Sequence, residues 1–252
     1  MTWKDGARWV YSITYDEGCA ELLEHVLPLH RNYGIPGHVC LVASQVGVPR
    51  NVPGSSYHGM MILSGEEVRG LVAEGWGVSC HSMTHAPIRE ENAQYEVVES
   101  RRVLEDALDM PINVFCVPGD NTSFPASRAV AREAGYDAIM TIYDRINPPG
   151  CDLLSLGRVP IHTEYPPPFS SVFDPYKRLH QARDAGGWVI DYCHCPRPGT
   201  PIHPAKDCTT EELEDRFATV RRVGSDDVWL AEPGEVVAWI MKQRDGKKGT
   251  LR

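Results

Sequence analysis

The sequence predicts an α/β fold in which parallel strands close into a barrel. Strand-like and helix-like segments alternate about seven times along the chain, which is typical of a parallel sheet covered by helices. Residues able to do chemistry follow the ends of four expected strands, at Asp16, His81, Asp120 and His194. A barrel gathers such strand ends into one mouth, whereas an open, doubly wound sheet spreads them along a crevice. We therefore expect a barrel, with residues 1–252 forming a single domain.

The N-terminal segments supply the first two strands. In residues 8–15, large apolar and aromatic side chains alternate with others, which indicates a strand with two different faces. Residues 20–31 carry apolar side chains at helical spacing. Residues 38–43 are almost all apolar, as expected of a strand buried on both faces. Segment 45–60 contains proline, glycine and polar residues, and we expect it to be a loop.

The next segments add a helix, a strand and a long helix. Ser64 and Glu67 have the spacing of a capping box at a helix start, and Gly75 is placed to end that helix. Residues 77–80 are expected to form the third strand. A long helix is expected over residues 90–108, where apolar positions recur at helical spacing.

The rest of the chain continues the alternation. The further expected strands are residues 112–117, 138–142, 153–161, 188–194 and 227–230. The further expected helices are residues 127–134, residues 176–185, one capped by Thr209 and Glu212, and one begun by Pro233. The proline cluster Pro166–Pro168 is expected to form a stiff surface loop.

The bulk composition argues against several classes of partner. A formal net charge of -9 and a pI near 5.6 argue against nucleic acid or an anionic membrane as the main partner. No stretch of about 18 apolar residues is present, so we expect no membrane span. The N-terminus lacks an apolar leader, which predicts a cytoplasmic protein. A homo-oligomer is compatible with this composition.

The eight cysteines contain no C-x-x-C pair, which favours reduced thiols over disulfides. The group Cys193–Cys195, with His194 at its centre, also fits part of a structural zinc site. A closed zinc site needs four ligands, however, and only Cys208 lies nearby in the sequence. We therefore favour free thiols.

Two histidines four residues apart, His81 and His85, carry the clearest chemical signal. Imidazoles at this spacing can reach one cation from a helical turn or from the loop that ends a strand. Hydrolysis by such a cation also needs a carboxylate ligand and an open coordination position. The acidic pair Asp16 and Glu17, at the end of the first expected strand, offers the carboxylates.

In this order, the segments resemble the polysaccharide deacetylases with NodB homology. Residues 14–18 (TYDEG) stand where that family has T-F-D-D-G, and residues 81–85 (HSMTH) match its H-S/T-x-x-H motif. Residues 114–120 resemble a degraded form of its third motif, and residues 192–194 resemble its late Leu-x-His motif. The pattern from residues 228 to 239 is similar to the closing strand and helix. The resemblance implies an irregular (β/α)7 barrel that removes acyl groups from N-acetylated sugars with a divalent metal.

The resemblance also implies roles for individual residues. Asp16 would be the general base and His194 the general acid that protonates the departing amine. Glu17, His81 and His85 would be the metal ligands. Zinc is the favoured metal for two imidazoles and a carboxylate, although cobalt, nickel, manganese and iron also accept this set.

Substrate and oxyanion contacts are expected from Pro118, Gly119, Asp120 and Arg158, and Arg158 has the alternative of pairing with a carboxylate. The sequence departs from the family at two points. Glu17 replaces the second aspartate of the first motif. The arginine of the third motif, which orients the base, is missing, with Cys116 or Val117 in its place.

The function implied is a metal-dependent hydrolase that removes an acyl group, acetyl in the simplest case, from an N-acylated sugar or a small amide. One alternative is a metal-independent C–N hydrolase of a non-sugar amide or cyclic ureide, as in allantoinase-like relatives. A second alternative is a non-catalytic barrel that binds carbohydrate. The change at Glu17 is what the metal-independent alternative predicts.

Overall fold

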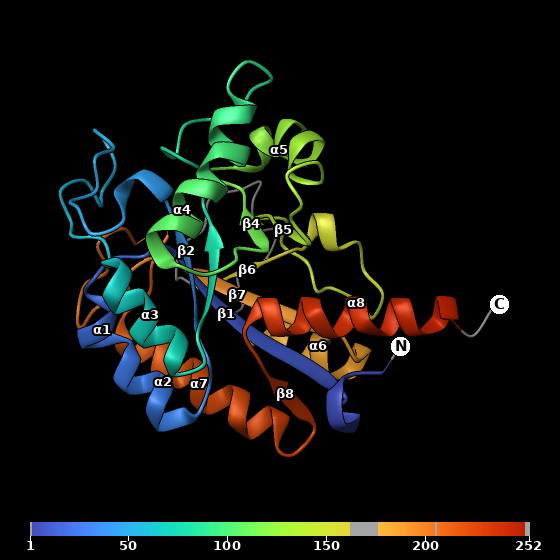
Figure 1. Cartoon of the computed structure of the whole chain (residues 1–252). Coiled ribbons are helices and arrows are strands. Elements are labelled where there is room, and N and C mark those ends of the chain that lie inside the picture. Colours follow the sequence, from blue (N-terminus) through green and yellow to red (C-terminus); the bar gives the residue numbers. More distant parts are fainter. Residues whose placement is uncertain (1, 162–175, 205, 250–252) are drawn as a thin grey trace.

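The computed structural model describes residues 2–161, 176–204 and 206–249, so the loop expected at Pro166–Pro168 lies outside the described residues. Within them, eight parallel strands form one curled sheet, surrounded by helices (Figure 1). The strand order is β5-β4-β3-β2-β1-β7-β6, and β8 pairs with the start of β1. The strands are β1 (Trp9–Glu17), β2 (His38–Leu41), β3 (Gly77–Cys80), β4 (Val114–Cys116), β5 (Ala138–Met140), β6 (Val159–Pro160), β7 (Trp188–Cys193) and β8 (Val228–Leu230).

The two edges of the sheet approach each other between β5 and β6. Met140 forms a parallel bridge with Leu156, which lies just before β6. The backbone N–H groups of Thr141 and Leu156 donate to the carbonyls of Leu156 and Ile139, at 2.9 and 2.8 Å. These contacts nearly close the curled sheet, and the expected irregular α/β barrel is confirmed.

The helices are close to those that the sequence predicts. The capping boxes Ser64–Glu67 and Thr209–Glu212 are both formed, at the starts of α3 and α7. The α-helices of the described residues are α1 (Leu22–His25), α2 (Leu27–Tyr33), α3 (Gly65–Ala73), α4 (Ser100–Leu108), α5 (Phe124–Ala131), α6 (Lys177–Ala185), α7 (Thr210–Gly224) and α8 (Pro233–Gly249). None of the helices that the structure describes is both long and apolar enough to cross a membrane.

Several predicted elements are wrong in detail. The helix expected over residues 20–31 is divided into α1 and α2, and the helix expected over residues 127–134 begins and ends three residues earlier, as α5. The helix expected over residues 90–108 begins as a π-helical segment, η3 (Gln94–Glu99), before α4. The strand expected over residues 153–161 is instead a 3-10 turn followed by the two-residue β6. In β6, Pro160 has no backbone N–H and cannot donate to a sheet ladder, which limits how far the strand extends.

The central strand β1 separates two packed layers. Its odd-numbered residues from Trp9 to Tyr15 point outward into an apolar core shared with the helices. Its inner face begins apolar and becomes polar toward the C-terminal end of the strand, through Ser12, Thr14 and Asp16, all buried. Because side chains alternate along a strand, this pattern aims Asp16 into the barrel.

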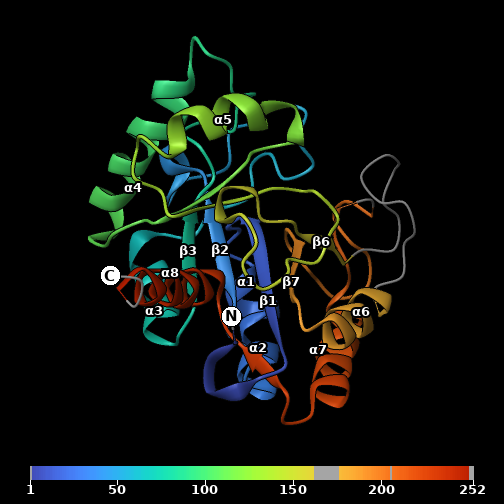
Figure 2. The same cartoon turned by 90° about the vertical axis from the view of Figure 1, so that its right-hand side faces the viewer.

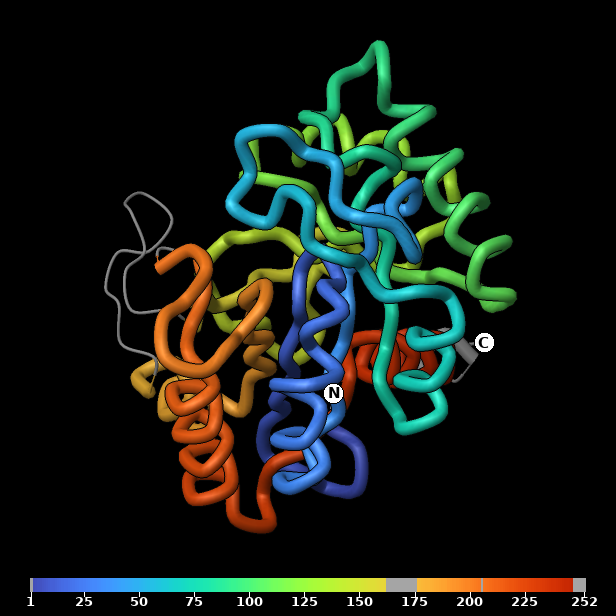
Figure 3. The backbone as a smooth tube through the Cα atoms, turned by 90° about the vertical axis from the view of Figure 1, so that its left-hand side faces the viewer, coloured from blue at the N-terminus to red at the C-terminus, as the bar shows by residue number. Residues whose placement is uncertain are grey.

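Helix α8 fills the inner space near the strand starts. Its residues Val236, Val237 and Ile240 share an apolar cluster with Val10 and Trp188, which lie near the starts of β1 and β7. Figures 1 and 2 show α8 lying against this side of the sheet. The opposite end, where the strands finish, carries the long loops (Figure 3).

Candidate active site

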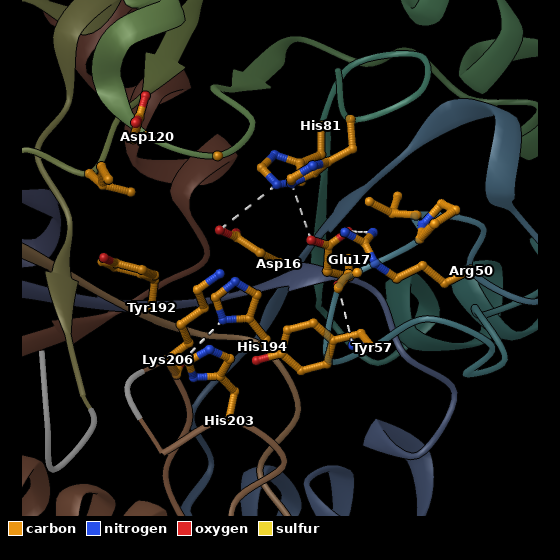
Figure 4. Close-up of a pocket in the computed structure, with 17 residues that line it drawn as sticks. Asp16, Glu17, Arg50, Tyr57, His81, Asp120, Tyr192, His194, His203 and Lys206 are labelled. Atoms are coloured by element: carbon orange, nitrogen blue, oxygen red, sulfur yellow. Dashed lines mark hydrogen bonds and ion pairs between the residues drawn. The ribbon is translucent and has the colours of Figure 1, made fainter. Parts of the chain in front are cut away.

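A cavity of about 680 Å³ opens at the C-terminal ends of the strands (Figure 4). Seven of its lining residues are sites predicted from the sequence: Asp16, Glu17, His81, His85, Gly119, Asp120 and His194. Ten further lining residues were not predicted as site residues: Arg50, Val52, Pro53, Gly54, Ser55, Tyr57, Ile142, Tyr192, His203 and Lys206. Candidate catalytic and metal-binding residues from distant parts of the chain therefore line one cavity, as the barrel prediction requires.

Asp16 is held by a buried arginine. The Nη1 and Nη2 atoms of Arg158 donate to Oδ1 and Oδ2 of Asp16, at 2.6 and 3.0 Å. Burial alone would raise the pKa of Asp16, but the charges of Arg158 and His81 hold that pKa well below its ordinary value. The carboxylate is therefore ionised and fixed in orientation, as a general base must be.

Arg158 does not contact the cavity, which corrects the prediction of a substrate or oxyanion role. Its side chain is fully buried. Its Nε donates to the carbonyl of Thr141, Nη1 also donates to Oγ1 of Thr14, and its guanidinium lies 4.5 Å from the centre of the Tyr192 ring. The second expectation, pairing with a carboxylate, is the one that agrees with the structure.

The predicted metal ligands meet beside Asp16. One donor atom from each of Glu17, His81 and His85 lies within 4.8 Å of the others. Nε2 of His85 is 3.2 Å from Oε1 of Glu17. Nδ1 of His81 is 3.0 Å from the carbonyl of Cys116, so Nδ1 carries the proton. Nε2 therefore keeps its lone pair and can bind a metal. Nε2 of His81 lies 4.0 Å from Oδ2 of Asp16.

These three residues fit a divalent cation. Burial lowers the pKa of His81 to about 4 and places the pKa of His85 well below its ordinary value, so both rings are neutral near pH 7, as ligands must be. The 3.2 Å separation in the His85–Glu17 pair is close to the ~3.4 Å edge of a tetrahedron with ~2.1 Å bonds to zinc. The donor set, two imidazoles and a carboxylate, suits zinc.

A buried glutamate shapes the loop that carries the histidines. Ser82 and His85 have positive φ values of 69° and 67°, which are unusual for residues with a side chain. Oε2 of Glu96 accepts the backbone N–H groups of Met83 and Thr84, at 3.1 and 3.0 Å. The π-helical turn η3 supplies Glu96, and such turns are frequent at functional sites. The strained loop is therefore held by this carboxylate.

Arg50 is a site residue that the sequence reasoning missed. Its guanidinium forms an ion pair with Oε2 of Glu17, and the residue is only 2% exposed. It lies in the loop predicted over residues 45–60, which follows β2 and reaches the same mouth (Figure 3). The available signal was its place after a strand, since loops at the C-terminal ends of barrel strands form the active site.

His194 lies on the other side of the cavity from the proposed metal ligands and is held by three neighbours (Figure 4). Its Nδ1 donates to the carbonyl of Lys206 at 3.1 Å, which leaves Nε2 free. The ring of Tyr57 stacks on it, with centroids 5.1 Å apart and planes at 10°. The Tyr57 hydroxyl donates to Asp207 at 2.7 Å, and Asp207 also accepts the backbone N–H of His194 at 2.9 Å. Burial lowers the pKa of His194, against the opposing charge of Asp207.

The turn after β4 contributes backbone to the cavity. Gly119 has a φ of 68° and lines the cavity together with Asp120. The carboxylate of Asp120 accepts the backbone N–H of Thr122 at 2.8 Å, so it caps the turn as well as facing the cavity. Pro118 is buried and does not line the cavity, which corrects its predicted contact with substrate.

The alternative of a structural zinc site around Cys193–Cys195 finds no support. The cysteines Cys193, Cys195 and Cys208 are buried in the outer apolar core, and no group of metal ligands in the described part of the chain includes them. His203, which the sequence analysis does not single out, lines the cavity.

The sequence model of the family described as polysaccharide deacetylase matches residues 4–139 of the 252. No curated protein matches.

Several solved structures share the fold. A Mycobacterium smegmatis protein assigned to the polysaccharide deacetylases aligns over 97% of this chain and 94% of its own, with a TM-score of 0.62 and 16% identity. The T48 deacetylase, solved with substrate, aligns over 91% of both chains with a TM-score of 0.51 and 11% identity. IcaB from Ammonifex degensii aligns over 59% of this chain and 66% of its own, with a TM-score of 0.51 and 24% identity.

Proposed function

This chain belongs to the polysaccharide deacetylase family, hydrolases of C–N bonds outside peptides, and we propose that it removes an acetyl group from an N-acylated sugar with the help of a divalent metal. The observation that carries the proposal is the grouping in one cavity of a fixed carboxylate, Asp16, three neighbouring donors, and an imidazole, His194. Amide hydrolysis needs a base, an electrophile and an acid, and this cavity holds a candidate for each.

Glu17, His81 and His85 would hold the metal, with zinc favoured by the donor set. When bound, the metal polarises the amide carbonyl and makes a nearby water more acidic. Asp16, held ionised by Arg158, accepts the proton of the attacking water.

His194 protonates the amide nitrogen so that the amine can leave. Its Nδ1–H is already bound to the carbonyl of Lys206, so the ring has to take up a second proton at Nε2, and the imidazolium then delivers that proton to the amine. Gly119 and Asp120 line the cavity, and a backbone N–H near them would stabilise the tetrahedral oxyanion, a contribution of roughly 3 kcal/mol per donor in other acyl-transfer enzymes.

Arg158 supplies the orientation of the base that the family obtains from its third motif. The third-motif position here holds Cys116, whose thiol lies 3.7 Å from Oδ1 of Asp16 and brings no charge. The guanidinium of Arg158, which lies just before β6, contacts the same carboxylate instead. This relocation explains how the third motif can be degraded while the base stays fixed.

The test is acetate release from a panel of N-acetylated sugars and oligosaccharides by zinc-loaded protein. Native protein should release acetate, and Asp16→Asn should lose at least ~1,000-fold while still binding zinc. Addition of a chelator should abolish release, and zinc should restore it. Equal acetate release by the native and Asp16→Asn proteins would overturn the proposal. If native protein released no acetate and Asp16→Asn bound sugar with unchanged affinity, the carbohydrate-binding barrel would be favoured.

One observation favours a second candidate, a metal-independent C–N hydrolase acting on a non-sugar amide or cyclic ureide. Arg50 already supplies a cation to Glu17, which is the carboxylate that the metal would use. Under this candidate the chelator has no effect and native protein hydrolyses a ureide but no N-acetyl sugar.

A single-domain chain, a cytoplasmic location and a homo-oligomer remain predictions from the sequence.

A further inference from the structure

A permanent positive charge lies beside the proposed metal ligands. Arg50 is buried, and its guanidinium forms an ion pair with Oε2 of Glu17 while Oε1 of the same carboxylate faces His85. The buried Nε of Arg50 has no hydrogen-bond partner among the described residues. Glu17 is therefore the counter-charge of this arginine (Figure 4).

The charges around the proposed metal position are already balanced before any cation enters. Asp16 is paired with Arg158 and Glu17 with Arg50, so two carboxylates meet two guanidinium groups. A divalent cation at Glu17 would therefore add two positive charges next to Arg50, in a buried site where charges interact more strongly than in water.

The backbone of the loop that carries Arg50 is anchored at that residue. The backbone N–H of Arg50 donates to the carbonyl of Met60 at 2.7 Å, and the N–H of Gly59 donates to the carbonyl of Arg50 at 2.8 Å. The next bridge, Pro49 with Met61, is part of the same antiparallel pairing. A cation bound at Glu17 would therefore lie next to the guanidinium of Arg50.

We propose that Arg50 competes with the metal for Glu17 and thereby keeps the metal weakly bound and exchangeable. This inference rests on the proposed metal-dependent function. Arg50 holds Glu17 in place while the cation is absent. When a cation binds, the charge of Arg50 repels it. It is a positioning residue that acts through Glu17, and it sets the affinity for the metal.

The experiment measures zinc affinity by chelator competition and by calorimetry for native protein, Arg50→Met and Arg50→Lys. Arg50→Met removes the charge and keeps most of the side-chain volume, so it should bind zinc at least tenfold more tightly. Arg50→Lys keeps the charge and should stay within about threefold of native. Arg31→Met, which breaks the distant exposed pair with Glu74, is the matched control and should leave the affinity unchanged.

Thermal unfolding gives a second readout that does not depend on activity. Without metal, Arg50→Met should unfold at a lower temperature than native protein because Glu17 has lost its counter-charge. Zinc should raise the unfolding temperature of this variant more than that of native protein. If Arg50→Met does not fold, Arg50→Gln, which keeps a polar group at the site, replaces it.

The outcomes separate the inference from the proposed function. Equal or weaker zinc binding by folded Arg50→Met, with normal binding by native protein, overturns the inference and leaves the function standing. No binding by native protein but stoichiometric binding by Arg50→Met supports the inference and overturns the metal-dependent function. No binding by either protein overturns both.

Discussion

Arg158, which lies just before the edge strand β6, donates to both carboxylate oxygens of Asp16. Its Nη1 and Nη2 atoms lie 2.6 and 3.0 Å from Oδ1 and Oδ2, and both residues are buried. The two residues are 142 positions apart in the chain. They meet because only one strand, β7, separates β1 from β6 in the sheet. A two-pronged contact of this kind fixes the plane of the carboxylate as well as its charge.

Replacing Arg158 by lysine should lower kcat by at least ~100-fold while leaving zinc binding intact. Lysine keeps the positive charge but cannot hold both oxygens of Asp16, so the base loses its orientation. Arg158→Met should be worse, because it leaves a buried carboxylate without a partner and costs about 3–5 kcal/mol of unfolding free energy. Steady-state kinetics of acetate release and urea unfolding measure the two effects.

The control for this prediction is Arg128→Lys, which alters an exposed pair with Asp152 and should change neither value appreciably. A kcat for Arg158→Lys within twofold of native would contradict the orienting role.

Tyr57→Phe should lower kcat about five- to thirty-fold and change KM little. The phenyl ring still stacks on His194, but the hydroxyl that donates to Asp207 at 2.7 Å is lost, and Asp207 also holds the backbone of His194. A lost hydrogen bond of this kind contributes roughly 1–2 kcal/mol, which is enough for a five- to thirty-fold effect on the acid step. Tyr95→Phe, at an exposed position, is the matched variant. If Tyr57→Phe lowered the stability of the protein and left kcat unchanged, Tyr57 would be a packing residue only.

The sequence predicts the parts of the site that local patterns encode. The alternation along β1 places Asp16 on the inner face, and the spacing of His81 and His85 places both rings on one loop. Capping boxes identify the starts of α3 and α7 because they need only four consecutive residues. These features depend on short-range chemistry, so they can be read before the fold is known.

Other parts depend on long-range contacts and could not be derived in the same way. The pairing of Arg158 with Asp16 requires the order of β1, β7 and β6, which no local pattern specifies. Arg50 lies in an irregular loop whose sequence contains no periodicity, so its approach to Glu17 follows only from the folded path of that loop. The π-helical turn that presents Glu96 was missed because its apolar spacing resembles that of an α-helix.

Glu96→Gln should weaken zinc binding about 10–100-fold although Glu96 is not a ligand. Its carboxylate accepts the N–H groups of Met83 and Thr84 and so holds the positive-φ backbone of His85. Loss of support around metal ligands has effects of about this size in other proteins. Chelator competition measures it. Glu99→Gln, one turn away and exposed, is the control, and equal affinities of the two variants would contradict the prediction.

His30 should make the protein less stable in mild acid. Burial lowers its pKa in the folded state to about 3, against the opposing effect of a hydrogen bond to the Ile35 carbonyl. In the unfolded chain the ring titrates near pH 6.5, so between these values the unfolded state binds one more proton than the folded state. The stabilisation is complete above about pH 6.5 and is lost as pH falls toward about 3, at about 1.4 kcal/mol per pH unit.

Urea unfolding with a chelator present, repeated at several values from about pH 7 down to about pH 5, measures this slope for native protein and for His30→Gln. Glutamine can keep a hydrogen bond to the Tyr15 hydroxyl, which lies 2.7 Å from Nε2 of His30, but it does not titrate. The variant should lose stability more slowly as the pH falls, by about 1.4 kcal/mol per pH unit. His81 and His85 contribute alike to both proteins, so they cancel in the difference. Parallel slopes for the two proteins would mean that His30 takes up its proton within the folded state.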